Sequence, residues 1–180
     1  MKINLLCLLF SLLPILAKAQ NCKYEKNETD PFTKKKEIIT KKDRLFTFTD
    51  GVSIGVGNND TYSSILNAYI ELSDSAKFLI FDLEGNLKYF MYLSDVFLLL
   101  SDGTVCKFHD FKKQTLTGNS SNGQTNTIYR IYCTVSIDQQ KLLKNNTISQ
   151  VPIHGYQNAS MEKEIKDKNS DVIKNLIKCA

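Results

Sequence analysis

Residues 76–108 read AKFLIFDLEGNLKYFMYLSDVFLLLSDGTVCKF and carry three strongly apolar runs. Apolar runs alternate in it with turns, and the runs are 78–81, 89–93 and 96–100. Runs of this length bounded by turns indicate strands that are covered on both faces. Gly85 and Gly103 lie in the turns, where a left-handed backbone favours a residue without a side chain. The stretch therefore predicts an antiparallel meander.

Strand and loop signals continue on both sides of this stretch. Residues 36–48 are rich in Ile and Thr, and Asp50-Gly51 follows them. Two strand-like runs around Asp-Gly predict a β-hairpin, with a Gly/Asn loop over 55–60 after it. Residues 117–126 are rich in Gly, Ser and Asn and predict an exposed loop. Apolar and polar residues alternate over 129–135, which predicts a half-buried strand.

The last third of the chain carries the helical signals. Ser136 and Gln139 fit a capping box, which predicts the start of a short helix. A short strand is expected over 148–153, after the Asn pair that ends this helix. Residues 160–178 place apolar side chains at helical spacing, which predicts a C-terminal helix.

These elements predict an α+β fold with β dominant, an antiparallel sheet or sandwich closed by the C-terminal helix over about 160–178. An all-β sandwich with a peripheral helix is the alternative. Residues 20–180 form one domain in either case, because their number suits a single core of useful size.

The N-terminus predicts a signal peptide over residues 1–19. Lys2 gives it a positive start, 5–16 are mostly apolar, and Ala17-Lys18-Ala19 provides small residues at the cleavage site. The apolar run is shorter than the roughly 20 residues that a membrane-spanning helix needs. We therefore expect cleavage, no later transmembrane segment, and export to the periplasm, the cell surface or the medium.

Charge argues against nucleic acid as a partner. The chain holds 23 Lys and Arg against 19 Asp and Glu, and Lys2 and Lys18 belong to the expected leader. The remaining surplus of two positive charges is too small for the electrostatic footprint of a nucleic-acid binder.

The cysteines agree with an oxidising compartment. Cys7 belongs to the leader, and Cys22, Cys106, Cys133 and Cys179 remain. Four cysteines allow three connectivities, of which Cys106–Cys133 with Cys22–Cys179 is favoured here. The alternative is one bridge or none, with buried thiols acting as small apolar groups.

Catalytic and metal-binding signatures are sparse. The chain has no Gly-x-Ser-x-Gly elbow, and its two histidines are His109 and His154. Cys106 and His109 are close in sequence, but residues three apart on a strand point to opposite faces. Carboxylates that a glycosidase would need lie near predicted strand ends, with no pair singled out: Asp82, Glu84, Asp95, Asp102 and Asp110. We predict no catalytic residue, no cofactor and no metal.

A basic cluster is the one candidate contact surface. It consists of Lys34, Lys35, Lys36, Lys41, Lys42 and Arg44. Such a cluster suits contact with an anionic glycan, a lipid head group or nucleic acid. The alternative is a solvated edge strand, where lysines prevent aggregation between sheets.

Short motifs along the chain are similar to those of small uncharacterised exported proteins of Bacteroidota. The motifs are Cys22 with NETDPFT (27–33), the strand-to-helix step over 132–140, and Ile-Lys-Cys at 177–179. The resemblance implies export and no particular activity.

Two classes of function remain open at this point. The first is an exported non-enzymatic module that binds a glycan, an envelope component or a protein. The second is an extracytoplasmic hydrolase with a carboxylate or histidine site. The chain has no Trp, so a sugar would stack on tyrosines such as Tyr62, Tyr129, Tyr132 or Tyr156.

Overall fold

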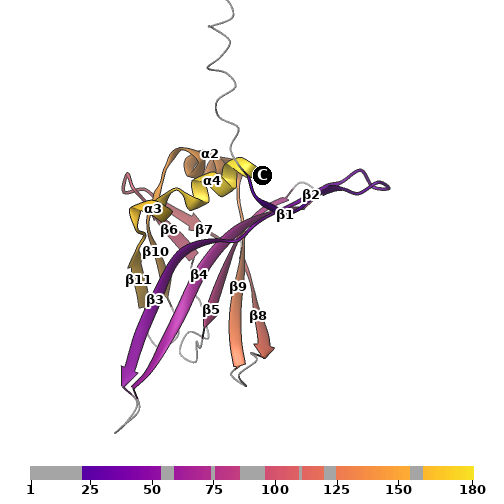
Figure 1. Cartoon of the computed structure of the whole chain (residues 1–180). Helices are drawn as coiled ribbons and strands as arrows, with labels where there is room; N and C mark the ends of the chain where they lie inside the picture. Colours follow the sequence, from indigo (N-terminus) through magenta and orange to yellow (C-terminus); the bar gives the residue numbers. More distant parts are fainter. Residues whose placement is uncertain are drawn as a thin grey trace, which may run out of the picture.

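The computed structural model describes residues 22–53, 59–73, 76–85, 96–109, 111–119, 125–154 and 160–180. In this part of the chain, two antiparallel sheets enclose one core and helices cover one end of it (Figure 1). The predicted α+β fold, β-dominant with a C-terminal helix, is confirmed. The expected signal peptide lies outside the described residues.

The described strands belong to two sheets. Sheet A has seven strands in the order β1-β2-β4-β5-β9-β8, and β3 also pairs with β4. Its strands are β1 (Tyr24–Thr29), β2 (Lys36–Thr40), β3 (Asp43–Ser53), β4 (Asn59–Ser73), β5 (Ala76–Gly85), β8 (Phe111–Asn119) and β9 (Thr125–Thr134). Sheet B has four strands in the order β11-β10-β6-β7. They are β6 (Val96–Leu100), β7 (Val105–Phe108), β10 (Ile148–His154) and β11 (Ser160–Glu164).

The core lies between the two sheets. Alternate residues of β4 and β6 point into it, as the period of two of a strand requires. Side chains of β3, β5 and β9 from sheet A meet those of β7 and β10 from sheet B in one buried cluster. Burial of each Leu, Ile or Phe there contributes about 1.5–3 kcal/mol. This burial fixes which face of sheet A is left to the outside.

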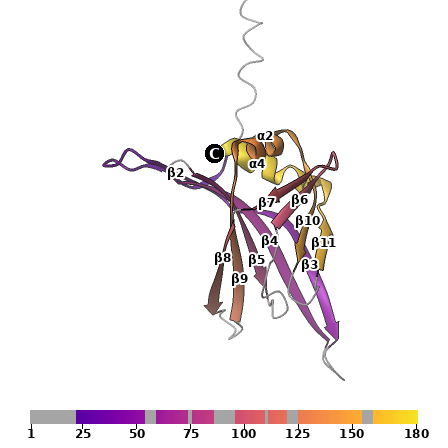
Figure 2. The same ribbon diagram turned by 180° about the vertical axis from the view of Figure 1, so that it is seen from behind.

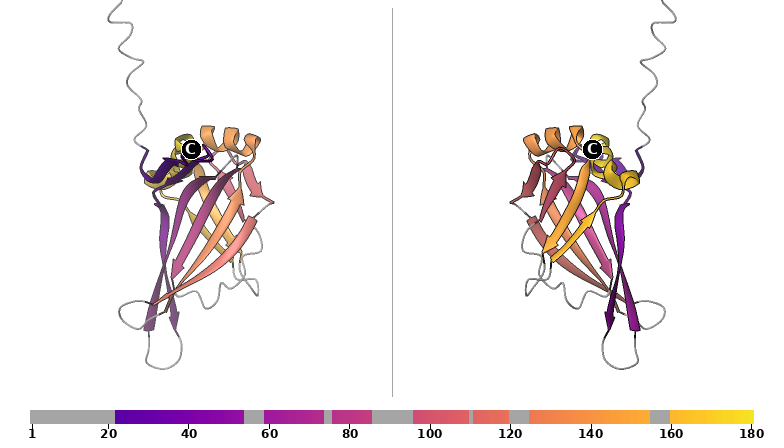
Figure 3. Two further views of the ribbon diagram at one scale, coloured as in Figure 1. Left: turned by 90° about the vertical axis from the view of Figure 1, so that its right-hand side faces the viewer. Right: turned by 90° about the vertical axis from the view of Figure 1, so that its left-hand side faces the viewer.

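The helices close one end of the core (Figures 2 and 3). They are α2 (Ile137–Asn145), α3 (Asp167–Ser170) and α4 (Val172–Cys179). The buried side of α4 consists of Ile173, Leu176 and Ile177, and the helix packs against α2, β3 and β4. Among the described residues, no helix has the length and hydrophobicity that crossing a bilayer requires.

The capping box predicted for α2 is confirmed. The Gln139 backbone N–H donates to Ser136 Oγ at 3.2 Å, and the Ser136 N–H donates to Gln139 Oε1 at 2.8 Å. The Gln139 side chain also donates to the carbonyl of Lys107 at 2.9 Å, which joins the start of α2 to β7.

Removal of this cap is expected to lower the stability of the domain moderately. Ser136→Ala leaves the Gln139 N–H without its acceptor and lowers the free energy of unfolding by about 1 kcal/mol. Urea denaturation measures the loss. Lys141→Ala is the control in the same helix, because the Lys141 side chain is 72% exposed. Equal stability of the two variants would contradict the prediction.

The predicted single meander is wrong, because its strands belong to different sheets. Strand β5 pairs with β4 and β9, whereas β6 pairs with β10 and β7. The turn between β6 and β7 forms as expected, with Gly103 at φ 83°. The apolar run at 89–93 lies outside the described residues.

Two segments predicted as turns are strand in the parts that the structure describes. Strand β3 continues through Asp50 and Gly51, which pair with Tyr62 and Thr61 of β4. Strands β8 and β9 pair as far as Asn119 and Thr125, so both ends of the loop expected over 117–126 are strand. Residues 120–124 lie outside the described residues. In both cases extended pairing with the next strand in the chain outweighs the local turn signal.

The C-terminal helix begins later than the predicted residue 160. Residues 160–164 form β11, which pairs with β10 from Gln150 to His154. The free edge of β10 supplies backbone hydrogen bonds, and pairing with this preceding strand overrides the helical spacing of the side chains. The short strand expected over 148–153 is confirmed as β10.

Strands β1 and β2 form an arm that extends away from the body of the molecule (Figures 1 and 2). Cys22, at the base of the arm, forms a disulfide with Cys179 at the end of α4. The Tyr24 hydroxyl donates to the carbonyl of Cys179 at 3.0 Å. The arm is therefore tied to the helical end of the domain.

Candidate ligand-binding face of sheet A

The face of sheet A that points away from the core carries rows of polar and aromatic side chains. Residues opposite each other in antiparallel strands share a face, with Cβ atoms about 4.5–5.5 Å apart. One row is Tyr69, Ile80, Tyr132 and Lys112, and the rows beside it are Asn67, Asp82, Arg130 and Gln114, and Glu71, Phe78 and Thr134. We call this surface the outer face.

A buried carboxylate organises the outer face. Asp82 is fully buried, and Arg130 faces it across the β5–β9 pair. The Arg130 Nε donates to Asp82 Oδ1 at 2.7 Å, and its Nη2 donates to Oδ2 at 2.9 Å. Lys42 Nζ lies 2.6 Å from the same Oδ2. Two cations thus hold one carboxylate, and the bidentate geometry fixes the guanidinium plane.

These charges also act on a buried tyrosine. Lys42 Nζ and the Arg130 guanidinium both lie 5.6 Å from the centre of the Tyr69 ring. Burial and then the negative charge of Asp82 raise the pKa of Tyr69 well above its ordinary value, so the phenol stays neutral. The cations and the ring together form a rigid base for the outer face.

The pKa of the Asp82 carboxyl is lowered. Burial opposes its ionisation, but the hydrogen bonds from Arg130 and Lys42 outweigh this effect. A carboxylate held in this way is ionised near neutral pH and unsuited to act as a general acid. Asp82 therefore has a structural role in the described part of the chain.

A groove of about 450 Å³ lies beside this cluster on the outer face. Glu71, Phe78, Lys112, Lys113, Gln114 and Tyr132 line it. The half-buried rings of Phe78 and Tyr132 provide apolar surface, and the Tyr132 hydroxyl donates to Gln114 Oε1 at 3.4 Å. Two lysines and one glutamate surround the rings. The groove therefore combines aromatic surface, hydrogen-bonding groups and excess positive charge.

The structure divides the basic cluster expected from the sequence. Lys34, Lys35 and Lys36 lie at the tip of the arm, and Lys41, Lys42 and Arg44 lie near the start of β3. Lys42 is paired with Asp82, and Arg44 faces Asn67 across the β3–β4 pair. The six residues therefore do not form one contact surface.

Of the two expected disulfides, one is present. Cys22 and Cys179 are bonded, whereas Cys106 and Cys133 are free, buried thiols. The expected Cys106–Cys133 bridge is therefore not formed. Burial raises the pKa of Cys106 to about 11 and, together with the nearby Cys106, that of Cys133 to about 12. Both thiols act here as small apolar groups of the core.

The candidate catalytic residues are not brought together in the described chain. Cys106 points into the core and His109 is exposed, as the strand period predicted. Asp102 accepts the N–H of Thr104 in the β6–β7 turn at 2.9 Å, which is a structural role. The side chains of Asp95, Asp110 and His154 lie outside the description. Among the described residues, no three His, Cys, Asp or Glu side chains are placed to hold a metal ion.

The tyrosines suggested as a sugar platform have different surroundings. Tyr132 lines the groove, whereas Tyr129 packs against the core from the other face of β9. The side chains of Tyr62 and Tyr156 lie outside the description. Alternation over 129–135 placed Tyr132 on the outer side, and the structure adds Phe78, Lys112 and Gln114 from strands that sequence reasoning did not combine.

The chain matches no protein-family model, and no curated protein or solved structure is significantly similar to it. Its function is therefore inferred from the geometry and chemistry of its own surface.

Proposed function

We propose that this protein is an exported, non-enzymatic module that binds an acidic oligosaccharide on the outer face of sheet A. The observation that carries the proposal is the groove formed by Tyr132, Phe78, Lys112 and Gln114. Its lining comes from strands β4, β5, β9 and β8 of sheet A. Export rests on the leader predicted over residues 1–19 and is supported by the Cys22–Cys179 disulfide.

The aromatic rings suit the apolar faces of a sugar. Each pyranose ring has a face of C–H groups, and packing that face on an aromatic ring removes apolar surface from water. Tyr132 and Phe78 supply such rings on neighbouring strands. Gln114 and the Tyr132 hydroxyl can exchange their mutual hydrogen bond for bonds to sugar hydroxyls.

The lysines favour a sugar that carries negative charge. Lys112 and Lys113 line the groove, opposed by the carboxylate of Glu71. A carboxylate or sulfate on the ligand would interact favourably with this excess of positive charge. The Asp82–Arg130 pair lies one row away and keeps β5 and β9 in register beneath the ligand.

Substitution in the groove tests the proposal. We expect Tyr132→Ala to weaken binding of a uronic-acid oligosaccharide about tenfold or more, because it removes the ring on which the sugar packs. Lys112→Glu should weaken binding of the same ligand and have little effect on a neutral oligosaccharide of equal length. Isothermal titration calorimetry with the mature protein gives both dissociation constants.

Lys141→Glu is the matched control, because it changes the charge equally on α2, where the lysine side chain is 72% exposed. Circular dichroism and thermal melting establish that each variant is folded. The proposal is wrong if the wild-type protein binds no acidic oligosaccharide, or if Tyr132→Ala binds as well as the wild type.

A further inference from the structure

The tip of the β1–β2 arm exposes a large aromatic side chain. Phe32 is 92% exposed, more than the other large apolar residues exposed in the described chain, Ile137 at 72% and Val105 at 53%. Pro31 precedes it, and the arm extends away from the body of the domain (Figures 1 and 2). An exposed phenyl ring on a projecting tip is costly in water and favourable at an interface.

The turn that carries Phe32 is held by its own hydrogen bonds. Asp30 Oδ1 accepts the N–H groups of Phe32 at 2.7 Å and Thr33 at 3.0 Å. The backbone of Asp30 bonds to Lys34 and Lys35, each at 2.9 Å, and Lys34 has φ 60°. These contacts fix the conformation in which the turn presents Phe32.

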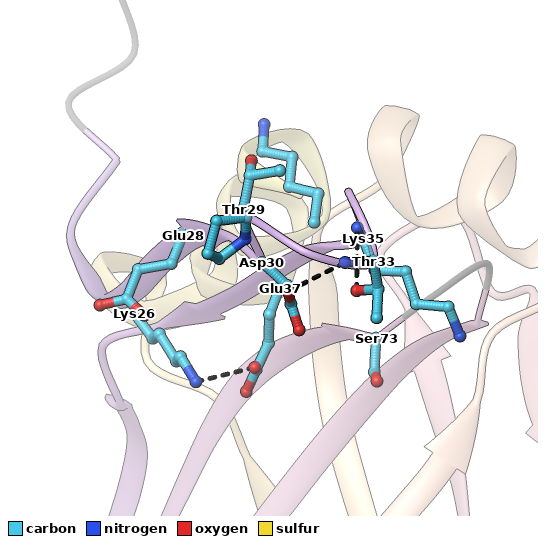
Figure 4. Close-up of a pocket in the computed structure, with 10 residues that line it drawn as sticks. Lys26, Glu28, Thr29, Asp30, Thr33, Lys35, Glu37 and Ser73 are labelled. Carbon is cyan, nitrogen blue, oxygen red and sulfur yellow. Dashed lines mark hydrogen bonds and ion pairs between the residues drawn. The ribbon is translucent and has the colours of Figure 1, made fainter.

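Charged side chains of both signs lie around the turn. Lys26 Nζ and Glu37 Oε2 form an ion pair at 2.8 Å, and the Asp30 carboxylate turns inward to the backbone (Figure 4). Lys34, Lys35 and Lys36 follow Phe32 after one residue, Thr33, and are exposed. In Figure 4 the Lys35 side chain extends away from the Lys26–Glu37 pair. The outermost part of the arm therefore combines one aromatic ring with three cationic side chains.

We infer that the tip of the arm, Phe32 with Lys34, Lys35 and Lys36, docks on a membrane surface that contains anionic lipids. Aromatic side chains are favoured at the level of the lipid head groups. Lysines near them are attracted by the negative surface potential. The projection of the arm lets its tip reach a flat surface while the domain stays in water. This inference is independent of the groove on sheet A.

Vesicle sedimentation tests the inference with the mature protein. We expect it to bind vesicles of mixed phosphatidylglycerol and phosphatidylcholine, and not vesicles of phosphatidylcholine alone. Phe32→Ala should lower the partition coefficient about tenfold, since the buried ring is lost. Replacing Lys34, Lys35 and Lys36 by Ala should abolish binding at physiological salt. Ile137→Ala, which removes another exposed apolar side chain, should have no effect.

A fluorescence reporter gives a second measurement. The chain has no Trp, so Phe32→Trp introduces a single indole at the tip. We expect its emission to shift to the blue on addition of anionic vesicles, whereas that of Ile137→Trp stays unchanged. Absence of binding to anionic vesicles overturns the inference. Equal binding by Phe32→Ala also overturns it, as does a blue shift produced by soluble proteins and not by vesicles.

Discussion

Removing the Cys22–Cys179 disulfide is expected to cost the domain about 5 kcal/mol, because the bridge closes a very long loop in the unfolded chain. The two cysteines are separated by 157 residues, so their cross-link strongly restricts the unfolded ensemble. A domain of ordinary stability has only about 5–15 kcal/mol in total. The Cys22→Ser, Cys179→Ser double variant should therefore be unfolded or marginally folded at room temperature.

Native contacts near the Cys22–Cys179 disulfide also depend on this disulfide. The Tyr24 hydroxyl bonds to the carbonyl of Cys179, and Lys77 Nζ bonds to the backbone oxygen of Ala180. Without the covalent link, β1 and the last turn of α4 can separate, and both bonds are exposed to water. The loss should therefore be seen first as fraying at the helical end of the core.

Urea denaturation followed by circular dichroism measures the effect, and the reduced wild type should resemble the double variant. Cys106→Ala is the control, since it removes a free thiol and should cost only about 1 kcal/mol. Equal losses of unfolding free energy in the two variants would mean that the Cys22–Cys179 cross-link contributes little to stability.

The sequence predicts the class of the fold because its local patterns are strong. The capping box at Ser136 and Gln139 depends on residues three apart, and it forms as expected. The alternation over 129–135 likewise needs only one strand and one buried face. Such features are determined within a few residues, so a single sequence is enough to predict them.

The displaced elements depend on pairing along whole strands, which a local turn or helix signal does not include. Residues 160–164 have helical spacing, but they pair with β10 as a strand. Asp50-Gly51 is a good turn sequence, but β4 pairs with β3 beyond it. A local pattern cannot show that a free strand edge is available, and backbone pairing to such an edge decides these segments.

The candidate site is harder to predict from the sequence than the fold. Its residues come together only through the order of the strands in the sheet. Asp82 and Arg130 meet because β5 lies beside β9, although two strands of sheet B come between them in the chain. One signal was present: Asp82 interrupts an apolar run, and a charge in a buried strand needs a partner. Its partner could not be chosen among the lysines and arginines without the register.

Asp82→Asn is expected to lower the free energy of unfolding by about 3 kcal/mol at neutral pH. The substitution keeps the size of the side chain but removes the charge that holds Arg130 and Lys42. Arg130 and Lys42 then lie against Tyr69 without the carboxylate that they share, and Lys42 keeps only the longer contact with Glu84 Oε1 at 3.9 Å. The Arg130 guanidinium is partly shielded from water. Asp138→Asn is the control, because that carboxylate is 94% exposed and should change stability little.

The pH dependence separates the loss of charge from the loss of packing. The pKa of Asp82 is lower in the folded protein than its ordinary value, so its ionised form favours folding. This contribution is complete above the unfolded-state pKa of about 3.9 and is lost as the pH falls further, through the folded-state pKa. Wild-type stability should therefore fall more steeply than that of Asp82→Asn below about pH 4. Parallel curves for the two proteins would show that the carboxylate is held without net electrostatic benefit, and Arg130 and Lys42 would then act on this face only by packing.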